Sequence, residues 1–134
     1  MTGEKILFVD DEMTICKLMV SRLKSKQYEV ESVSSGKDVL ARAKVIKPNL
    51  IILDQQMPEI TGVEVCKKLK ADAELKDIPV VFFTGNPQMD LEKQCIGVGA
   101  LGIIYKPEVG ALIKIVGRIL AGEEIDWGQD TDNY

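Results

Sequence analysis

The stretch Lys5-Ile-Leu-Phe-Val-Asp-Asp-Glu12 places four consecutive apolar residues directly before three carboxylates. A short apolar run of this kind is typical of a strand that is covered on both faces of a parallel sheet. The three acids have two interpretations. They suit the positive end of a helix that follows the strand, and they also supply ligands for a cation.

The same unit, an apolar run followed by a segment of helical periodicity, occurs five times along the chain. The apolar runs lie at residues 6–9, 28–33, 50–53, 80–83 and 101–105, and the helical patterns at residues 15–23, 39–46, 63–69, 91–98 and 109–120. This alternation predicts an α/β fold with a five-stranded parallel sheet wrapped by helices. The runs at 6–9, 50–53 and 80–83 are apolar throughout, which predicts central positions in the sheet.

Length and composition fit one domain. The chain has 134 residues, of which 46% are hydrophobic and 28% charged, so one core should bury roughly two-thirds of the unfolded surface. We predict a domain over residues 1–122, and an acidic tail or linker stub over residues 123–134, where the helical pattern stops. The start lacks an apolar signal segment and no run is long enough for a membrane span, so a cytoplasmic protein without membrane contact is expected.

Charge and cysteine content exclude several classes of function. The net charge of −4 and the lack of a basic cluster argue against direct nucleic-acid binding. Cys16, Cys66 and Cys95 are odd in number and widely spaced, which predicts buried thiols, not a disulfide framework or a zinc site. The sequence contains no histidine, so phosphoryl chemistry that needs one must take it from a partner.

Chemically active side chains follow four of the five predicted strands. Asp10 and Asp11 follow the first strand, Asp54 the third, Thr84 the fourth and Lys106 the fifth. Each residue alone suits a helix start, a turn, a strand end or a loop. Ligands of open parallel sheets bind beyond the carboxyl ends of the strands, whereas a chance pattern would scatter these residues over both edges. The sequence therefore predicts one site at one edge of the sheet.

The predicted site suits phosphoryl transfer. Carboxylates at close range repel each other unless a cation lies between them. Magnesium is the natural cation, because it binds through one or two carboxylates and accepts phosphate oxygens as further ligands. An ionised Asp54 beside the metal can attack phosphorus and form an aspartyl phosphate. Lys106 would pair with the phosphoryl oxygens, and the Thr84 hydroxyl would donate a hydrogen bond to one of them.

Five segments together resemble the receiver domain of two-component response regulators. They are Val9-Asp10-Asp11-Glu12, Leu53-Asp-Gln-Gln-Met-Pro-Glu-Ile-Thr-Gly62, Thr84-Gly85, Gly99-Ala100 and Lys106-Pro107, within residues 4–121. The resemblance implies a three-layer, doubly wound, flavodoxin-like fold with strand order 2-1-3-4-5. It also implies a response regulator that accepts a phosphoryl group on Asp54 from a histidine kinase or a histidine phosphotransfer protein, and then switches conformation for signal output.

The resemblance assigns further roles in the site. Asp11, Asp54 and the backbone carbonyl of Gln56 would ligate magnesium, with Asp10 acting largely through water. The side chain of Gln56 would tune the hydrolysis of the aspartyl phosphate. The Lys106–Pro107 peptide bond would be cis.

One position departs from the family pattern. The usual switch aromatic lies three residues before the lysine, where this chain has Ile103. Tyr105 lies directly before Lys106, and strand alternation puts Ile103 and Tyr105 on the same side of the sheet. Either Tyr105 substitutes for the aromatic, or the switch works without one.

The last helix carries a wide apolar face. The predicted core stripe consists of Val109, Leu112, Ile113, Val116 and Leu120, and the residues that widen it are Ala111, Ile115 and Ile119. Either the core stripe is simply wide, or this face makes a homodimer or effector contact.

Three other functions compete with a phosphorylated receiver. A flavin-binding module needs phosphate-cradling amides after the first strand, where this chain has acids. A small-molecule phosphatase needs a nucleophile after the first strand, a second acid two residues further on, and a cap segment. Here Met13 follows Glu12, and the sequence offers no cap segment. A receiver that serves only as a constitutive interaction domain does not need the acids that this chain retains at Asp10, Asp11 and Asp54. We therefore predict a signalling domain that catalyses only its own phosphorylation and dephosphorylation.

Overall fold

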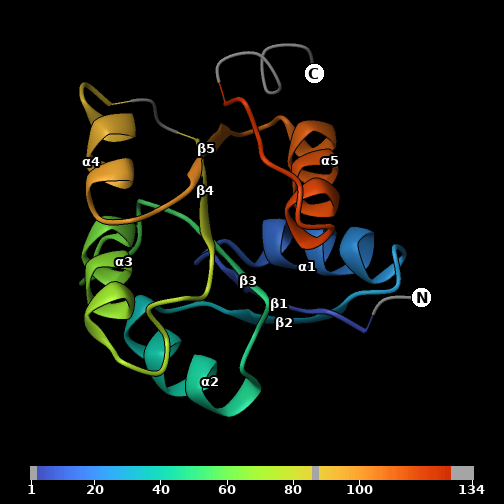
Figure 1. The fold of residues 1–134 in the computed structure, drawn as a ribbon, viewed down its shortest axis with the longest axis horizontal. Coiled ribbons are helices and arrows are strands. Elements are labelled where there is room, and N and C mark those ends of the chain that lie inside the picture. The colour runs from blue at the N-terminus through green and yellow to red at the C-terminus, as the bar shows by residue number, and fades with distance from the viewer. Residues whose placement is uncertain (1–2, 86–87, 128–134) are drawn as a thin grey trace.

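The structure, a computed structural model, describes residues 3–85 and 88–127. Five strands and five α-helices alternate along these residues (Figure 1). The strands are β1 (Lys5–Val9), β2 (Glu29–Val33), β3 (Leu50–Leu53), β4 (Val80–Thr84) and β5 (Gly102–Tyr105). The helices are α1 (Met13–Lys24), α2 (Val39–Ile46), α3 (Gly62–Ala71), α4 (Leu91–Gly97) and α5 (Val109–Leu120), and a 3₁₀ turn (Gly36–Asp38) precedes α2.

The strands form one parallel sheet in the order β2-β1-β3-β4-β5, which confirms the predicted fold. Val9 is paired with Leu53, and Leu53 with Phe82. These pairings bring the carboxyl ends of β1, β3 and β4 to one edge. The three strands predicted to be central are interior, and their apolar residues are buried.

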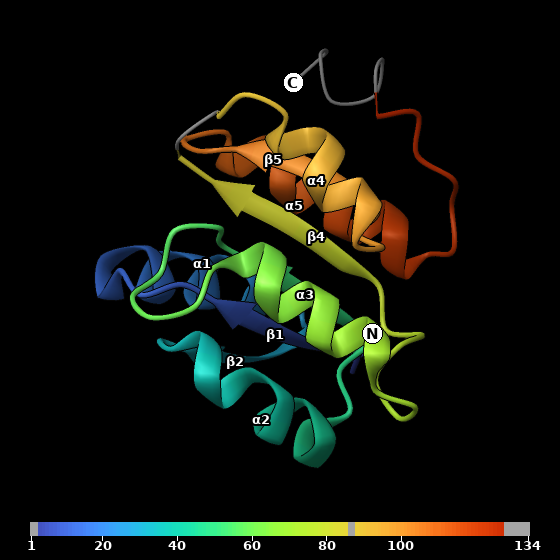
Figure 2. The same cartoon turned by 90° about the vertical axis from the view of Figure 1, so that its left-hand side faces the viewer.

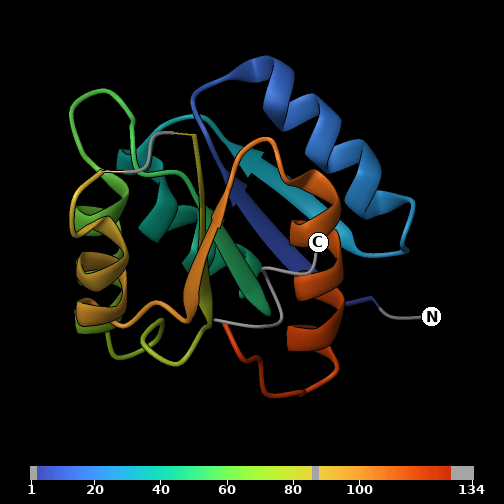
Figure 3. The same cartoon turned by 90° about the horizontal axis from the view of Figure 1, so that it is seen from above.

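Helices cover both faces of the sheet in two layers. Helices α1 and α5 lie on one face, and α2, α3 and α4 lie on the other (Figures 1 and 3). Successive strand residues point to opposite faces, so Leu7 and Val9 pack in the core with α2, α3 and α4, whereas Ile6 and Phe8 pack with α1 and α5. Figure 2 shows the layer of α2, α3 and α4 across the strands. The sheet backbone therefore separates two cores.

The apolar face of α5 belongs to the core to a greater extent than the sequence predicted. Ala111 and Ile115, which were assigned outside the stripe, are 4% and 0% exposed. Ile113 and Leu120, which were assigned to it, are only partly buried. Leu112 and Val116 of the stripe are fully buried, so the stripe was right in part, and the burial of Ala111 and Ile115 supports the alternative of a wide core stripe. Ala111 and Ile115 are thus core residues, whereas Ile119, the third residue that widens the face, is only partly buried.

The chain continues to pack beyond α5. Ile125 and Trp127 contact the core formed with α1 and α5, whereas residues 128–134 of the predicted tail lie outside the described residues. The three cysteines are free and buried, as predicted. No helix in the described part of the chain has the length and hydrophobicity of a membrane span.

Candidate functional site

Asp10, Asp54 and Lys106 meet at the carboxyl edge of the sheet. The Lys106 Nζ atom lies 2.6 Å from Asp10 Oδ2 and 3.6 Å from Asp54 Oδ2. Asp10 and Asp54 are 0% and 4% exposed, and the Lys106 side chain is also largely buried. The Lys106 ammonium also lies over the Phe83 ring, 5.9 Å from its centroid. Two carboxylates and one ammonium thus share a site that is mostly closed to water.

Asp10 connects β1 to the start of α1. Its Oδ1 accepts a hydrogen bond from the backbone N–H of Glu12 at 2.9 Å, while its Oδ2 faces Lys106. The Cys16 thiol donates to the Asp10 carbonyl at 3.1 Å. Glu12 is the N-cap residue of α1, but its side chain makes no capping bond. The two interpretations of the acids are therefore compatible at Asp10, which supports the first turn and also faces the site.

The loop after Asp54 is fixed by Gln55 and Gly62, two residues of the segment Leu53–Gly62 to which no role was assigned from the sequence. Gln55 is 7% exposed, and its Oε1 accepts the N–H of Val63 at 2.8 Å. Its carbonyl accepts the N–H of Gly62 at 2.9 Å. A Cβ on Gly62 would lie 2.2 Å from the carbonyl oxygen of Asp54, so only glycine fits there. No periodicity or residue type marked Gln55, because polar residues in a loop are normally exposed.

Helix α3 begins with a capping box that further stabilises this loop. The Thr61 Oγ1 accepts the N–H of Glu64 at 3.3 Å, and the Glu64 carboxylate accepts the N–H of Thr61 at 3.4 Å. The arrangement satisfies two backbone donors at the helix start. The segment between Asp54 and α3 is thus anchored at its far end as well.

The buried charges of the site influence one another. Burial raises the pKa of Asp54, the neighbouring Asp10 raises it further, and Lys106 opposes both. Burial alone would lower the pKa of Lys106, but Asp10, Asp54 and Glu12 outweigh it and the pKa is raised. Burial and Asp10 also raise the pKa of the Cys16 thiol. An added positive charge near Asp54 would favour the ionised form of this carboxyl.

Three carboxylates form a candidate metal site. Asp10, Asp11 and Asp54 each offer an oxygen, and these oxygens lie within 4.8 Å of one another. They are the one such group found among residues 3–85 and 88–127. Asp11 and Gln56 are exposed and line a cavity of about 420 Å³ beside the buried acids. An all-oxygen set of this kind suits a hard divalent cation.

Thr84 adds a buried donor to the same edge. Its side chain is 0% exposed, and its Oγ1 makes no well-formed hydrogen bond in the described structure, although it lies close enough to the Asp54 carboxylate to lower the pKa of Asp54. The Thr84 carbonyl accepts the N–H of Lys106 at 2.8 Å, and the Lys106–Pro107 peptide bond is cis. Ile103 is buried and Tyr105 partly buried, and both pack in the core with α3 and α4. They therefore share one side of the sheet, as predicted.

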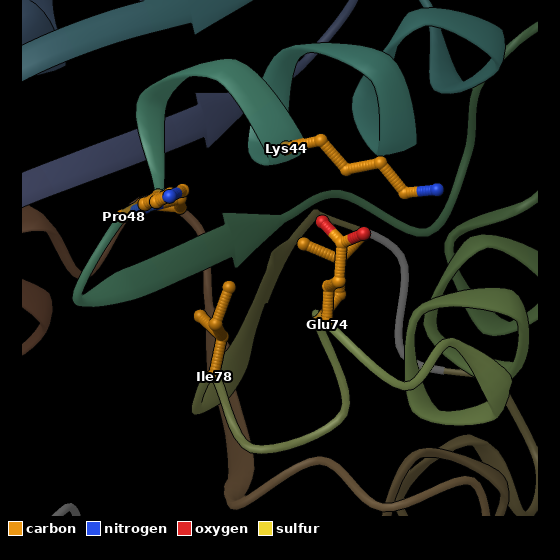
Figure 4. A pocket seen from close by; sticks show the side chains of 6 residues that line it. Lys44, Pro48, Glu74 and Ile78 are labelled. Atoms are coloured by element: carbon orange, nitrogen blue, oxygen red, sulfur yellow. The ribbon is translucent and has the colours of Figure 1, made fainter.

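A second cavity lies at the opposite edge of the sheet (Figure 4). It has a volume of about 440 Å³ and is lined by Lys44, Lys47, Pro48, Glu74, Leu75 and Ile78. Pro48 and Ile78 precede β3 and β4, so this cavity is at the amino ends of these strands. Lys44 forms an ion pair with Asp72 at 3.1 Å. The candidate metal ligands and Lys106 lie at the carboxyl ends of the strands, so that end of the sheet is the better candidate for a reactive site.

Comparisons with known proteins agree with this geometry. Residues 6–117 match the response regulator receiver domain. The alkaline phosphatase synthesis transcriptional regulatory protein PhoP of Bacillus subtilis is 34% identical over 87% of this chain and 49% of its own length. The two-component response regulator ORR3 of Oryza sativa is 36% identical over 76% of this chain and 79% of its own length. The chain thus spans about half the length of PhoP.

Solved structures show the same similarity. The chemotaxis response regulator CheY4 of Vibrio cholerae superposes with a TM-score of 0.81 at 31% identity, covering 88% of this chain and 99% of CheY4. The fold, the family match and the cluster of acids at the carboxyl ends of the strands therefore all point to a receiver domain.

Proposed function

Because this chain belongs to the response regulator receiver domain family, we propose that Asp54 accepts a phosphoryl group from a phosphohistidine of a partner protein in a magnesium-dependent reaction. The domain is a signalling module and not an enzyme in the usual sense. Its only catalysis, in this proposal, is of its own phosphorylation and of the later hydrolysis of the aspartyl phosphate.

One observation supports the proposal above all others. The buried Asp54 carboxylate lies beside the Lys106 ammonium, at 3.6 Å, and close to the Thr84 hydroxyl, which makes no well-formed hydrogen bond in the described structure. A buried donor without an acceptor is costly. A phosphoryl group on Asp54 would supply acceptor oxygens to Thr84 and anionic oxygens to Lys106. Both residues thus suit the product better than the unmodified site.

The transfer itself is a displacement at phosphorus. An oxygen of ionised Asp54 attacks the phosphorus of the phosphohistidine and forms the new O–P bond. The N–P bond breaks, and its electron pair remains on the imidazole nitrogen. Lys106 balances the charge that spreads over the phosphoryl oxygens, and Thr84 donates a hydrogen bond to one of them. Gln55 and Gly62 hold the Asp54 loop in place.

Asp10, Asp11 and Asp54 are the residues that would hold magnesium. The spacing of their oxygens supports this, and so does the raised pKa of Asp54, because a nearby cation favours the ionised carboxylate that the reaction needs. Gln56 would contribute its backbone carbonyl, as the resemblance implies. Magnesium would supply positive charge for the phosphoryl oxygens.

The partner follows from the chemistry. The sequence contains no histidine, so the donor lies outside it, on a histidine kinase or a histidine phosphotransfer protein. Phosphorylation replaces the single negative charge of the Asp54 carboxylate with about two negative charges on the phosphoryl group, and this change can shift a neighbouring loop or face. Ile103 and Tyr105 are the switch positions in this proposal, and a cytoplasmic location suits it. A flavin-binding function is not favoured, because the family match and the acids both oppose it.

The test is an intact mass spectrum after incubation with acetyl phosphate and magnesium. We expect the wild type to gain one phosphoryl group, and expect no gain for Asp54→Asn or for the wild type with a chelator. A gain that persists in Asp54→Asn would move the acceptor to another residue. No gain in any sample, together with no magnesium binding by calorimetry, would favour the alternative of a constitutive interaction domain.

A further inference from the structure

The segment after α5 turns back and is fixed by several contacts. Gly122 has a positive φ of +81°, which allows the turn at the helix end. The N–H of Glu123 donates to the Arg118 carbonyl at 3.0 Å. The Arg118 guanidinium donates to the Glu123 carboxylate at 3.0 Å and to the Glu124 carbonyl at 3.4 Å. We call residues 122–127 the strap. Hydrogen bonds of the backbone and of the Arg118 side chain fix its path, in addition to the Arg118–Glu123 ion pair.

The strap ends on the edge strand β5. A Cβ added to Gly102 would lie 2.3 to 2.6 Å from three atoms of the Trp127 indole, so the ring rests directly on the strand backbone. Ile125 and Trp127 both pack in the core with α1 and α5. Gly102 and Ile104 share one side of β5, and Ile104 belongs to that same core. Glycine is the one residue at position 102 that leaves room for the indole.

Strand β5 connects this contact to the phosphorylation site. It has four residues, from Gly102 to Tyr105, and Lys106 follows directly. It pairs with β4 alone, as the last strand of the sheet, so fewer hydrogen bonds resist its movement than resist that of an interior strand. Trp127 rests on one end of β5, and Lys106 extends from the other.

We propose that phosphorylation of Asp54 loosens the strap from Gly102 and so transmits the state of the site to the C-terminal end of the described chain. Lys106 now pairs most closely with Asp10, at 2.6 Å. New anionic oxygens on Asp54 attract its ammonium away from Asp10 and pull on β5. The indole fits so closely on Gly102 that a small displacement of the strand removes the fit. This inference rests on the proposed function.

Trp127 provides the measurement, because it is the only tryptophan in the chain. Its emission maximum and its quenching by acrylamide report how well its contact with β5 shields the indole from solvent. In the full chain with magnesium, we expect acetyl phosphate to shift the emission to longer wavelength and to increase quenching. Intact mass is recorded on the same samples. Asp54→Asn should show neither the mass gain nor the fluorescence change.

Two glycine variants test the contact itself. Gly102→Ala should show the shifted emission and increased quenching before acetyl phosphate is added, and should still gain one phosphoryl group. Gly110→Ala is the matched control, because a Cβ there meets nothing within 4 Å. It should behave like the wild type.

Three results would overturn the inference. A wild type that gains the phosphoryl group with unchanged Trp127 quenching would refute the coupling and leave the proposed function intact. Unchanged fluorescence in Gly102→Ala would refute the role of the contact. A chain that gains no phosphoryl group would refute both the inference and the proposed function.

Discussion

The Lys106 ammonium lies 2.6 Å from the Asp10 carboxylate, and this ion pair is largely closed to water. A buried carboxylate that loses its partner is strongly destabilising, whereas a metal ion can replace the missing charge. The pair therefore connects the stability of the fold to the occupancy of the proposed metal site.

Lys106→Met should reduce stability most when magnesium is absent. With a chelator we expect the free energy of unfolding to fall by about 3 kcal/mol or more, because Asp10 is left buried and unpaired. With millimolar magnesium the loss should shrink, while phosphorylation by acetyl phosphate stays impaired. Urea unfolding measures both conditions. Lys67→Met, at an exposed position of α3, is the control. An equal loss with and without magnesium would contradict the prediction.

Thr84→Val should separate stability from function. The substitution removes a buried hydroxyl that makes no well-formed hydrogen bond in the described structure, and it nearly preserves the shape of the side chain. We expect stability to be unchanged or to rise by about 1 kcal/mol. Phosphorylation should be slower, because a donor to the phosphoryl group is lost. Thr84→Ser keeps the donor and should remain active. Thermal unfolding and intact mass test both variants, and a marked loss of stability in Thr84→Val would show that the hydroxyl is already satisfied.

Gly62→Ala should disturb the Asp54 loop. The new Cβ would lie 2.2 Å from the Asp54 carbonyl oxygen and 2.8 Å from the Phe82 ring, and overpacking of this kind costs about 1–3 kcal/mol. Phosphorylation should slow as well. Gly97→Ala, where a Cβ meets nothing within 4 Å, should be neutral or slightly stabilising. If chemical denaturation found the two variants equally stable, the loop would be more adaptable than its hydrogen bonds imply.

Cys95 should contribute to a loss of stability at alkaline pH. Burial raises the pKa of its thiol to about 12, while the unfolded chain titrates near the ordinary value of about 8.5. Between these values the unfolded state loses a proton that the folded state keeps. The free energy of unfolding is therefore unaffected by this thiol below about pH 8.5. Above that pH it falls by about 1.4 kcal/mol per pH unit.

Urea unfolding of the wild type and Cys95→Ala between pH 8 and pH 10.5 measures this effect. The stability of the wild type should fall more steeply than that of the variant, because the variant lacks this thiol. Parallel curves would mean that the Cys95 thiol titrates alike in both states.

The sequence predicted the sheet and most of the site for one physical reason. Parallel strands put the residues that follow them at a common edge, so Asp10, Asp54, Thr84 and Lys106 could be placed together before any contact was known. The acids were open to two interpretations. Asp10 takes part in the helix start, because it accepts the N–H of Glu12, and it also faces the site, where it pairs with Lys106; its role as a metal ligand stays a prediction.

Other features depend on contacts that local patterns do not specify. For Ile115 the sequence left a wide core stripe and a partner contact as alternatives, because helical periodicity gives the direction of an apolar stripe but not how many neighbours surround it. Gln55 is a polar residue whose burial depends on an N–H eight positions away. Trp127 lies on Gly102, and neither residue suggests the other in the sequence. Each case requires knowledge of tertiary packing.

The division of the interior into two cores has a consequence for how such chains diverge. The sheet backbone stands between the side chains of Leu7 and Val9 and those of Ile6 and Phe8. Substitutions in distant, independent sites have nearly additive effects, so one layer can accumulate changes without compensation in the other. Over evolutionary time, α2, α3 and α4 could be remodelled for new partners while α1 and α5 keep their ancestral packing.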